Sequence, residues 1–560
     1  MLRIQDSHWM RYRPSYLDLD GSKAPRTAES ADERSTQTNW VVEQTATYTK
    51  TFAQKHALTV LGMTSAEKNT GYRLDARMNN FPTDVIYTMT GGADLYVING
   101  RYDIDNTLIS YLARVNYVYD NKYMLTASIR RNGSSRFGKK NRWGNFPSAS
   151  VGWRIGQENF MKGIKPLNDL KLRVSYGVSG NRNIYEYYTH DGRLATNLYP
   201  TGDVARTVVS PYTMDNDYFS CEKTSQVNFG FDLSFIKNRI HFEADYYKGK
   251  SVGSPLSEIV PSITGFSNQT QNIGQVENKG LEFMLRTSNF VGAFQWSSDF
   301  NISFNRNKVL KLGADGRPIS ISYLSSSSPH ITAIDHPIAC FHGNVYEGVF
   351  MNQMDLDRYP HLENSKIGDG RYKDVNKDGK LDFYDRDFIG NNHPNFTGGL
   401  NNHFSYRNIS LNVHLTFSQG AQILSYFRRM IGIYHGDRNA MIEQLNRWRS
   451  AEEPGDGWHF RATRNPTGWQ RDVSSAWIED ASFLRIRNLS LAYDFDSKIT
   501  EMLHLKGFRL YATVHNLYTF TKYSGYDPET STETPVLQRG ADYGGYPAAR
   551  SFIIGVNVNF

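Results

Sequence analysis

The stretch Phe552-Ile-Ile-Gly-Val-Asn-Val-Asn-Phe560 decides the fold, because apolar residues alternate there with mostly polar ones up to the last position. Successive side chains of a β-strand point to opposite faces. One face of this strand is therefore apolar and carries Phe552, Ile554, Val556, Val558 and Phe560. In a soluble sandwich such a face packs on a core. In an outer-membrane barrel it faces lipid, and the other face lines the lumen.

The same alternation recurs in other parts of the chain. It is clearest in the segments 40–52, 226–235, 239–246, 294–305 and 409–418. In each of them the polar face carries acidic, amide, histidine or threonine side chains. A large soluble sandwich also alternates, so periodicity alone leaves both a barrel and a soluble β-protein open.

The composition suits a membrane barrel and excludes several other classes. Aromatic residues make up 13% of the 560 residues, as expected where aromatic girdles mark two membrane interfaces. The mean hydropathy is −0.55, and without a run of about 18 apolar residues a transmembrane helix is not expected. The net charge of +7 comes from scattered basic residues, so nucleic acid is not indicated as a partner. Two cysteines, Cys221 and Cys340, exclude a disulfide-rich scaffold.

The spacing of the strands favours the barrel over the sandwich. Fifteen strands are predicted, at 39–52, 56–68, 107–118, 122–132, 147–156, 169–178, 223–235, 239–249, 272–287, 293–305, 394–406, 409–419, 482–494, 507–519 and 550–560. Short turns alternate with long loops, and short helices are predicted within 421–449 and 496–505. Outer-membrane barrels show this asymmetry, with short periplasmic turns and long extracellular loops. The sequence therefore predicts an all-β, antiparallel transmembrane β-barrel.

The strand count also sets the expected domain boundaries. If the last strand ends in the periplasm, fifteen strands start outside, so residues 1–38 are predicted as an extracellular loop remnant. Residues 39–560 are then a partial barrel, because complete bacterial barrels have an even number of strands. The first residues, Met1-Leu-Arg-Ile-Gln, lack the apolar core of a signal peptide, so a trimmed or amino-terminally incomplete chain is expected.

Six stretches resemble the SusC/RagA branch of TonB-dependent outer-membrane transporters, in the order in which that family has them. They are Arg130-Arg-Asn-Gly-Ser-Ser-Arg-Phe-Gly, Trp143-Gly-Asn-Phe-Pro-Ser-Ala-Ser-Val-Gly-Trp-Arg, Gln271-Asn-Ile-Gly-Gln-Val-Glu-Asn-Lys-Gly-Leu-Glu, Asp480-Ala-Ser-Phe-Leu-Arg-Ile-Arg-Asn-Leu-Ser-Leu-Ala-Tyr, Asn516-Leu-Tyr-Thr-Phe-Thr-Lys-Tyr-Ser-Gly-Tyr-Asp-Pro-Glu and Tyr546-Pro-Ala-Ala-Arg-Ser-Phe. The resemblance covers about residues 38–560 and is specific because the stretches occur together. A terminal Phe in the apolar phase likewise resembles the closing strand of such barrels, which serves as a membrane-insertion signal.

The resemblance implies a plugged barrel of about 22 strands in the bacterial outer membrane. It implies import of oligosaccharides or peptides, with a SusD-like surface lipoprotein as lid and the TonB-ExbB-ExbD complex as energy source. The sequence departs from the family pattern because the signal peptide, TonB box, plug and first strands are missing. We therefore expect a carboxy-terminal barrel portion that cannot transport alone, since its open edges would leave backbone groups unpaired in outer-membrane lipid.

One motif predicts a metal site. The run Asp374-Val-Asn376-Lys-Asp378-Gly379-Lys380-Leu-Asp382-Phe-Tyr-Asp385 matches a calcium loop of the EF-hand or dockerin type. Oxygen side chains stand at positions 1, 3, 5, 9 and 12, Gly stands at position 6, and Lys380 at position 7 offers its backbone carbonyl. A plain Asp-Gly turn with solvated carboxylates is the alternative. We predict a structural calcium ion in an extracellular loop.

Other residue patterns point less clearly to function. Aromatic side chains of the long loops could stack on sugars or pack within the loops: Tyr185, Tyr187, Tyr188, Tyr212, Trp458 and Trp469. The sequence has neither the HExxH zinc motif nor a GxSxG nucleophile elbow, so an enzyme is not predicted. The alternative functions are a secreted, calcium-stabilised carbohydrate-binding β-protein and a glycan-degrading enzyme, which would need a paired-carboxylate cleft.

Overall fold

The computed structural model describes residues 2–15, 27–85, 88–89, 92, 94–161, 163–182, 189–202, 204–266, 268–321, 329–433, 439–464, 468–502, 504–532 and 535–560. The chain divides into two compact units. The first comprises Met1–Val151, Ser175–Ser225 and Ser251–Ile273, and the second comprises Gly152–Val174, Gln226–Lys250 and Gly274–Phe560.

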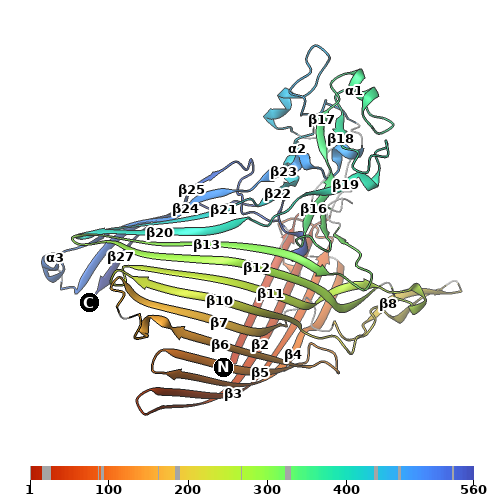
Figure 1. The fold of residues 1–560 in the computed structure, drawn as a ribbon. Coiled ribbons are helices and arrows are strands. Elements are labelled where there is room, and N and C mark those ends of the chain that lie inside the picture. The colour runs from red at the N-terminus through yellow and green to blue at the C-terminus, as the bar shows by residue number, and fades with distance from the viewer. Residues whose placement is uncertain are drawn as a thin grey trace. The chain divides into compact units, whose positions relative to one another are not determined.

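Sixteen strands of the described residues hydrogen-bond in one sheet, in the order in which they occur along the chain (Figure 1). They are β1 (Leu2–Arg13), β2 (Glu29–Phe52), β3 (His56–Asn79), β4 (Asp94–Tyr119), β5 (Tyr123–Ser134), β6 (Trp143–Arg154), β7 (Leu167–Asn181), β10 (Glu222–Phe235), β11 (Ile240–Ile259), β12 (Asn268–Val291), β13 (Phe294–Lys311), β20 (Phe396–Tyr406), β21 (Ile409–Gln419), β24 (Phe483–Asp494), β25 (Gly507–Thr521) and β27 (Ser551–Asn559). Each of the fifteen predicted strands coincides with one of them. The all-β, antiparallel class is therefore confirmed.

The prediction that the first strand starts near residue 39 is wrong. β1 pairs antiparallel with the first half of β2 over its whole length. The sequence does not reveal this strand, because Asp6 and His8 interrupt the apolar face on which Leu2 lies. In the structure, the His8 Nε2 atom bonds the Asp32 carboxylate at 2.9 Å. Residues 1–38, predicted as a loop, thus contain one strand and the start of another. Their location outside the membrane stays a prediction.

In the first unit, long hairpins follow the predicted turns. β2 and β3 stay in register over their whole length up to a tight turn at positions 53–55. Between β4 and β5 the turn residues Asp120 and Asn121 have φ values of 49° and 54°. Tight hairpin turns need positive φ, which Asp and Asn tolerate better than other residues. β3 and β4 also extend beyond their predicted ends, so the loop between them is shorter than expected. The first unit further holds the separate hairpin of β8 (Leu194–Thr201) and β9 (Val204–Pro211).

In the second unit, β12, β13, β20, β21, β24, β25 and β27 follow each other as antiparallel neighbours. Their apolar faces are solvent-exposed in the isolated chain: Ile409 and Leu491 lie on neighbouring strands of this face and both are exposed. A folded protein in water buries such a continuous face. The exposure therefore suits strands that contact lipid.

The long connections of the second unit fold together into a small domain, called here the loop domain. It comprises the segments 312–395, 420–482 and 522–550, which lie between the sheet strands. Its strands are β14 (Ile319–Ile321), β15 (His330–Thr332), β16 (Cys340–Asn344), β17 (Tyr346–Val349), β18 (Gly370–Tyr372), β19 (Arg386–Gly390), β22 (Gln422–Ser425), β23 (Ile478–Asp480) and β26 (Ala541–Asp542). One buried cluster joins residues of all three segments, among them Tyr372, Trp477 and Ala541. Burial of this cluster is what lets loops far apart in sequence form one body.

The described helices are short. They are α1 (Gln353–Arg358), α2 (Tyr426–Ile431) and α3 (Ser497–Met502). The predictions of short helices within 421–449 and 496–505 are confirmed by α2 and α3. None of the described helices has the length and the apolar character that a membrane span requires.

Candidate functional site

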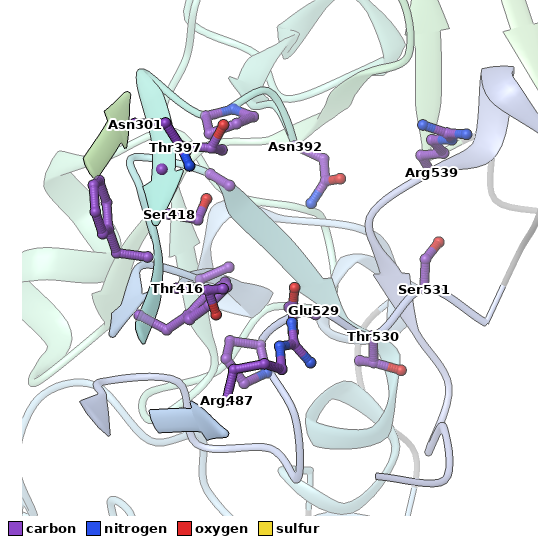
Figure 2. Close-up of a pocket in the computed structure, with 17 residues that line it drawn as sticks. Asn301, Asn392, Thr397, Thr416, Ser418, Arg487, Glu529, Thr530, Ser531 and Arg539 are labelled. Carbon is purple, nitrogen blue, oxygen red and sulfur yellow. The ribbon is translucent and has the colours of Figure 1, made fainter. Parts of the chain in front are cut away.

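A polar pocket of about 750 Å³ lies in the second unit, between the sheet and the loop domain. Figure 2 shows amide and hydroxyl side chains from β13, β20 and β21 on one side, namely Asn301, Thr397, Thr416 and Ser418. The loop domain supplies Glu529, Thr530, Ser531 and Arg539. The Thr416 hydroxyl is buried and finds no hydrogen-bond partner among the described residues. Its free hydrogen-bonding capacity suits a bound water or a polar ligand.

A glycine lets the strands behind the pocket pack closely on their apolar face. A Cβ atom at Gly398 would lie 2.3 Å from the Asn301 carbonyl oxygen and 2.4 Å from the Phe417 ring. Only a residue without a side chain lets the ring cover the backbone of β20 at this point. The Phe417 ring also stacks with Phe300, with centroids 6.2 Å apart. The strand side of the pocket is therefore held in place by close packing.

A bulge in β24 sets the position of the pocket arginine. The register of β24 shifts between Ile486 and Asn488 against β25, and at the same place against β21. Arg487 is the extra residue against β21, whereas Asn516 and Leu517 of β25 both lie opposite it. Bulges bend a strand and re-aim side chains, often next to functional sites. Figure 2 shows the Arg487 side chain reaching towards Glu529 across the pocket.

Four charged side chains form what we call the arginine–carboxylate network: Arg485, Arg487, Asp527 and Glu529. Arg485 donates at 2.6 Å to Asp527 and at 2.6 Å to Glu529, and Arg487 donates to the same Glu529 oxygen at 2.8 Å. Arg485 is 2% exposed and Asp527 is 7% exposed. Charge-assisted hydrogen bonds of buried groups are among the stronger polar interactions in proteins. The network ties the segment 522–550 to β24.

Backbone groups complete the environment of Asp527. The N–H of Glu529 donates to it at 3.0 Å, and the N–H of Ala548 donates at 3.3 Å. Burial opposes ionisation, but the Glu529 N–H and the Arg485 guanidinium outweigh it and hold the pKa of Asp527 below its usual range. Asp527 is therefore a carboxylate at neutral pH and an anchor for its loop.

A second anchor holds the other end of the same segment. The Tyr523 hydroxyl donates to Asp542 at 2.6 Å, and Asp542 also accepts from the N–H groups of Gly544 and Gly545. Both side chains are buried, and this burial raises the pKa of Tyr523. The segment that lines the pocket is thus fixed on both sides of residues 528–539.

The predicted calcium loop folds as a series of turns. Asp374 accepts from the N–H groups of Lys377 and Gly379, at 2.6 and 2.8 Å. Asp378 accepts from the N–H of Lys380 at 2.9 Å and from the Asn376 side-chain amide at 3.0 Å. These are the short-range bonds by which Asp and Asn side chains stabilise turns.

The other two acidic groups of this loop also bond the backbone. Asp382 caps a short turn by accepting from the Tyr384 N–H at 2.8 Å, and the fully buried Asp385 accepts from the N–H groups of Val375 and Asp382. In the part of the chain that the structure describes, no three His, Cys, Asp or Glu side chains come together as a possible metal site. Calcium binding by residues 374–385 stays a prediction.

The predicted insertion strand is β27, which pairs with β25. Its apolar face is exposed at Phe552, Ile554, Val556 and Phe560, whereas Val558 is partly buried. The geometry brings these side chains to one face, as the alternation predicts. Their role in membrane insertion stays a prediction.

Aromatic rings follow the sheet of the second unit in two groups. In the first, each ring contacts the next on neighbouring strands, with centroids 5.7–6.4 Å apart: Phe231, Phe242, Phe283, Phe304, Phe396 and Phe417. The second lies near the β12–β13 turn and comprises Phe290, Phe294, Trp296 and Phe404. Trp296 and Phe304 are separated along β13 by roughly 27 Å at about 3.4 Å per residue. Outer-membrane barrels have two aromatic girdles around an apolar band of about 25 Å.

The loop aromatics proposed from the sequence have different surroundings. Tyr185, Tyr187 and Tyr188 lie outside the described residues. Tyr212 is exposed, whereas Trp469 packs against the core cluster of the loop domain. The Trp458 ring is partly exposed and contacts Tyr346 edge to face. None of the three described rings lines the polar pocket.

The sequence analysis missed the arginine–carboxylate network, although a signal for it is present. Leu484 and Ile486 alternate with arginines, but the next apolar residue is Leu489 instead of position 488. This slip of the alternation by one residue marks a bulge, because a regular strand would turn one half of its apolar residues to the polar face.

Comparison with known proteins identifies the relatives of this chain. Residues 4–336 match the family model described as TonB dependent receptor-like, beta-barrel. TonB-dependent receptor P3 of Formosa agariphila is 32% identical over 544 residues, which is 95% of this chain and 53% of that protein. TonB-dependent receptor SusC of Bacteroides thetaiotaomicron is 31% identical over 468 residues, covering 82% of this chain and 44% of that protein. The chain thus spans about half the length of these relatives.

Solved structures share the fold. The RagAB peptide transporter superposes with a TM-score of 0.83 at 24% identity, covering 100% of this chain and 59% of that chain. The "open-open" state of the RagAB peptide importer gives a TM-score of 0.84, again at 24% identity, over 100% of this chain and 58% of that chain. The predicted outer-membrane barrel fold is confirmed by this likeness and by the family match.

Proposed function

This chain belongs to the family of TonB-dependent receptor β-barrels of the bacterial outer membrane, and we propose that it acts in nutrient uptake across that membrane. The observation that carries the proposal is the pocket of about 750 Å³, which is lined by polar side chains of the sheet and of the loop domain. A transporter needs such a polar site to bind its cargo before translocation. Family membership favours this function over the secreted carbohydrate-binding alternative and over catalysis.

The cargo is proposed to be an oligosaccharide or a peptide. The likeness to the RagAB peptide transporter supports the peptide class. The pocket offers amide and hydroxyl side chains, together with the ring of Phe483. These groups suit the hydroxyl and amide groups of both ligand classes.

The proposed partners are a SusD-like surface lipoprotein as lid and the TonB-ExbB-ExbD complex as energy source. They are proposed for the whole transporter, because the matched curated relatives are about twice as long as this chain. Affinity purification of the tagged protein from detergent-solubilised outer membranes tests the lid. Recovery of a surface lipoprotein in equal amount supports it, and purification of the barrel without one contradicts it.

The uptake experiment uses the source bacterium with the gene deleted and then restored. We expect uptake of labelled oligosaccharides or peptides to fall on deletion, to return on complementation, and to stop when TonB is absent. Unchanged uptake in the deletion strain, over a panel of both cargo classes, contradicts the proposed function. Vesicles holding only the 560-residue chain form the matched experiment for the prediction that this chain cannot transport alone.

A further inference from the structure

The charges around the polar pocket do not cancel. Arg485 pairs with Asp527, and Arg487 pairs with Glu529, so the arginine–carboxylate network is neutral as a whole. Arg539 lines the same pocket and is exposed. Among the described residues, no carboxylate and no other acceptor contacts its guanidinium group. One positive charge at the pocket is therefore left over.

A second arginine, Arg306, lies near the pocket without lining it, on the face of β13 that carries Phe304. Arg306 donates at 3.0 Å to the backbone carbonyl of Asn305 and at 3.0 Å to that of Asn395. Asn395 follows Pro394, which lines the pocket. Within the described part of the chain, Arg306 has backbone oxygens but no carboxylate as partners. A backbone carbonyl leaves the net charge of the guanidinium uncompensated.

Arg539 belongs to a segment that packs on another pocket-lining segment. A Cβ atom at Gly540, next to Arg539, would lie 2.5 Å from the Asn392 side chain. Asn392 lines the pocket, and the Arg306 contact lies three residues further along the same segment. Arg539 therefore belongs to a stretch of pocket lining that packs against Asn392. The nearest negative group in the pocket lining, Glu529, is already shared between two other arginines.

We propose that this pocket binds its ligand through a carboxylate group, with Arg539 as the cationic contact. The inference rests on the proposed uptake function and specifies the chemistry of its cargo. A guanidinium group matches a carboxylate in shape and donates two parallel hydrogen bonds to it. Asn301 and Asn392 then bond the neutral remainder of the ligand. The carboxylate belongs either to an acidic sugar or to a peptide.

The test compares ligands that differ only in this charge. Trigalacturonic acid is paired with its methyl ester, and N-acetyl-trialanine with its carboxyl-terminal amide. Binding to the full chain in detergent micelles is measured by isothermal titration calorimetry. We expect the acid of at least one pair to bind about tenfold more tightly than its neutral partner. Because the contacts are partly exposed, this preference should shrink as salt is raised.

Variants connect the preference to Arg539. Arg539→Gln should reduce the acid preference at least threefold, roughly, with little change for the neutral ligand. Arg306→Gln, which removes a cation outside the pocket lining, should leave the preference unchanged. Arg286→Gln serves as the matched control, because Arg286 lies on β12 in an exposed pair with Asp299. Both substituted arginines are at the surface or bond only backbone, so the fold should persist.

The outcomes separate the inference from the function. A preference for the uronate acid assigns the carboxylate to a sugar, and a preference for the free peptide acid assigns it to a peptide. Equal affinities within both pairs, or a salt-independent preference that survives Arg539→Gln, overturn the inference. If neutral ligands bind as well as acids and uptake still depends on the gene, only the inference fails. If uptake does not depend on the gene, the proposed function fails as well.

Discussion

Replacing Arg485 by methionine should release the pocket-lining segment 522–550 while leaving the sheet folded. Methionine keeps the length of the buried side chain but removes its charge and all its donors. Three hydrogen bonds are lost, to Asp527, to Glu529 and to the Thr519 hydroxyl at 2.8 Å. Glu529 keeps Arg487 as a partner, whereas Asp527 keeps only backbone donors.

The magnitude follows from the burial of the pair. Removing one partner of a buried ion pair costs about 3–5 kcal/mol, because the other charge remains buried. Asp527 keeps two N–H donors and borders a pocket that water can enter, which favours the lower end of this range. We therefore expect a loss of about 3 kcal/mol in the free energy of local opening. This corresponds to an increase of about 150-fold in the opening equilibrium.

Hydrogen exchange followed by mass spectrometry measures this equilibrium locally. Under conditions of fast reclosing, the exchange rates of backbone amides in peptides covering 526–532 should rise by about the same factor. Peptides from β13 and β21 should not change. The control is Arg286→Met, whose ion pair with Asp299 has side chains 57% and 53% exposed and should contribute at most about 1 kcal/mol. Exchange in 526–532 that stays within threefold, roughly, of wild type, or that rises equally in the control, refutes the reasoning.

Three further predictions concern the membrane face, the pH response and the calcium loop. Leu491→Arg, at a side chain 52% exposed on the apolar face, should cost about 2–4 kcal/mol if this face meets lipid, measured by urea unfolding from vesicles. The control is Asn412→Arg on the polar face, and equal effects would contradict the orientation. The pKa of Asp527 is lower in the folded protein than in the unfolded chain, where it is about 3.9. The ionised carboxylate therefore stabilises the fold fully above pH 3.9, roughly, and this stabilisation is lost as the pH falls through the pKa of the folded protein. The melting temperature of the loop domain, followed by tryptophan fluorescence, should therefore fall in acid, and less so in Asp527→Asn. A similar fall in both proteins would argue against this anchor. Calcium, but not magnesium, should raise that melting temperature through residues 374–385, and Asp378→Ala should abolish the rise; an unchanged melting temperature with and without chelator would rule the ion out.

The strands could be predicted from the sequence because a single physical requirement determines their residue pattern. A strand that separates an apolar medium from a polar interior must alternate residue by residue, and fifteen of the sixteen described sheet strands do so. β1 was not found because Asp6 and His8 break its apolar face. These two side chains are tolerated since His8 bonds Asp32 on the neighbouring strand. That contact depends on pairing, which local periodicity does not contain.

The candidate site could not be predicted in the same way. Arg485 and its partners Asp527 and Glu529 are 42 and 44 positions apart, and the two carboxylates lie in a loop without periodicity that follows β25. Both ends are visible in the stretches that carry the family resemblance, Asp480 to Tyr493 and Asn516 to Glu529. The resemblance indicated that these residues belong together in a family but did not reveal that they touch. For the predicted calcium loop the sequence shows a clear ligand spacing, but in the fold its carboxylate oxygens accept hydrogen bonds from the backbone.

The bulge at Arg487 lets β24 present its apolar residues to lipid and its arginines to the pocket. Before the bulge, Leu484 and Ile486 lie on the apolar face, and after it Leu489 and Leu491 lie there, although two residues, instead of one, separate the two pairs. A regular strand could keep only one pair on the lipid side and would turn the other inward. Turning Arg485 to lipid instead would cost about 2–4 kcal/mol near the middle of the membrane and would leave Asp527 without its cation. One inserted residue therefore keeps both apolar pairs outside and both arginines at the pocket. The irregularity of β24 is thus the feature that lets a membrane strand hold the loop that lines the proposed binding site.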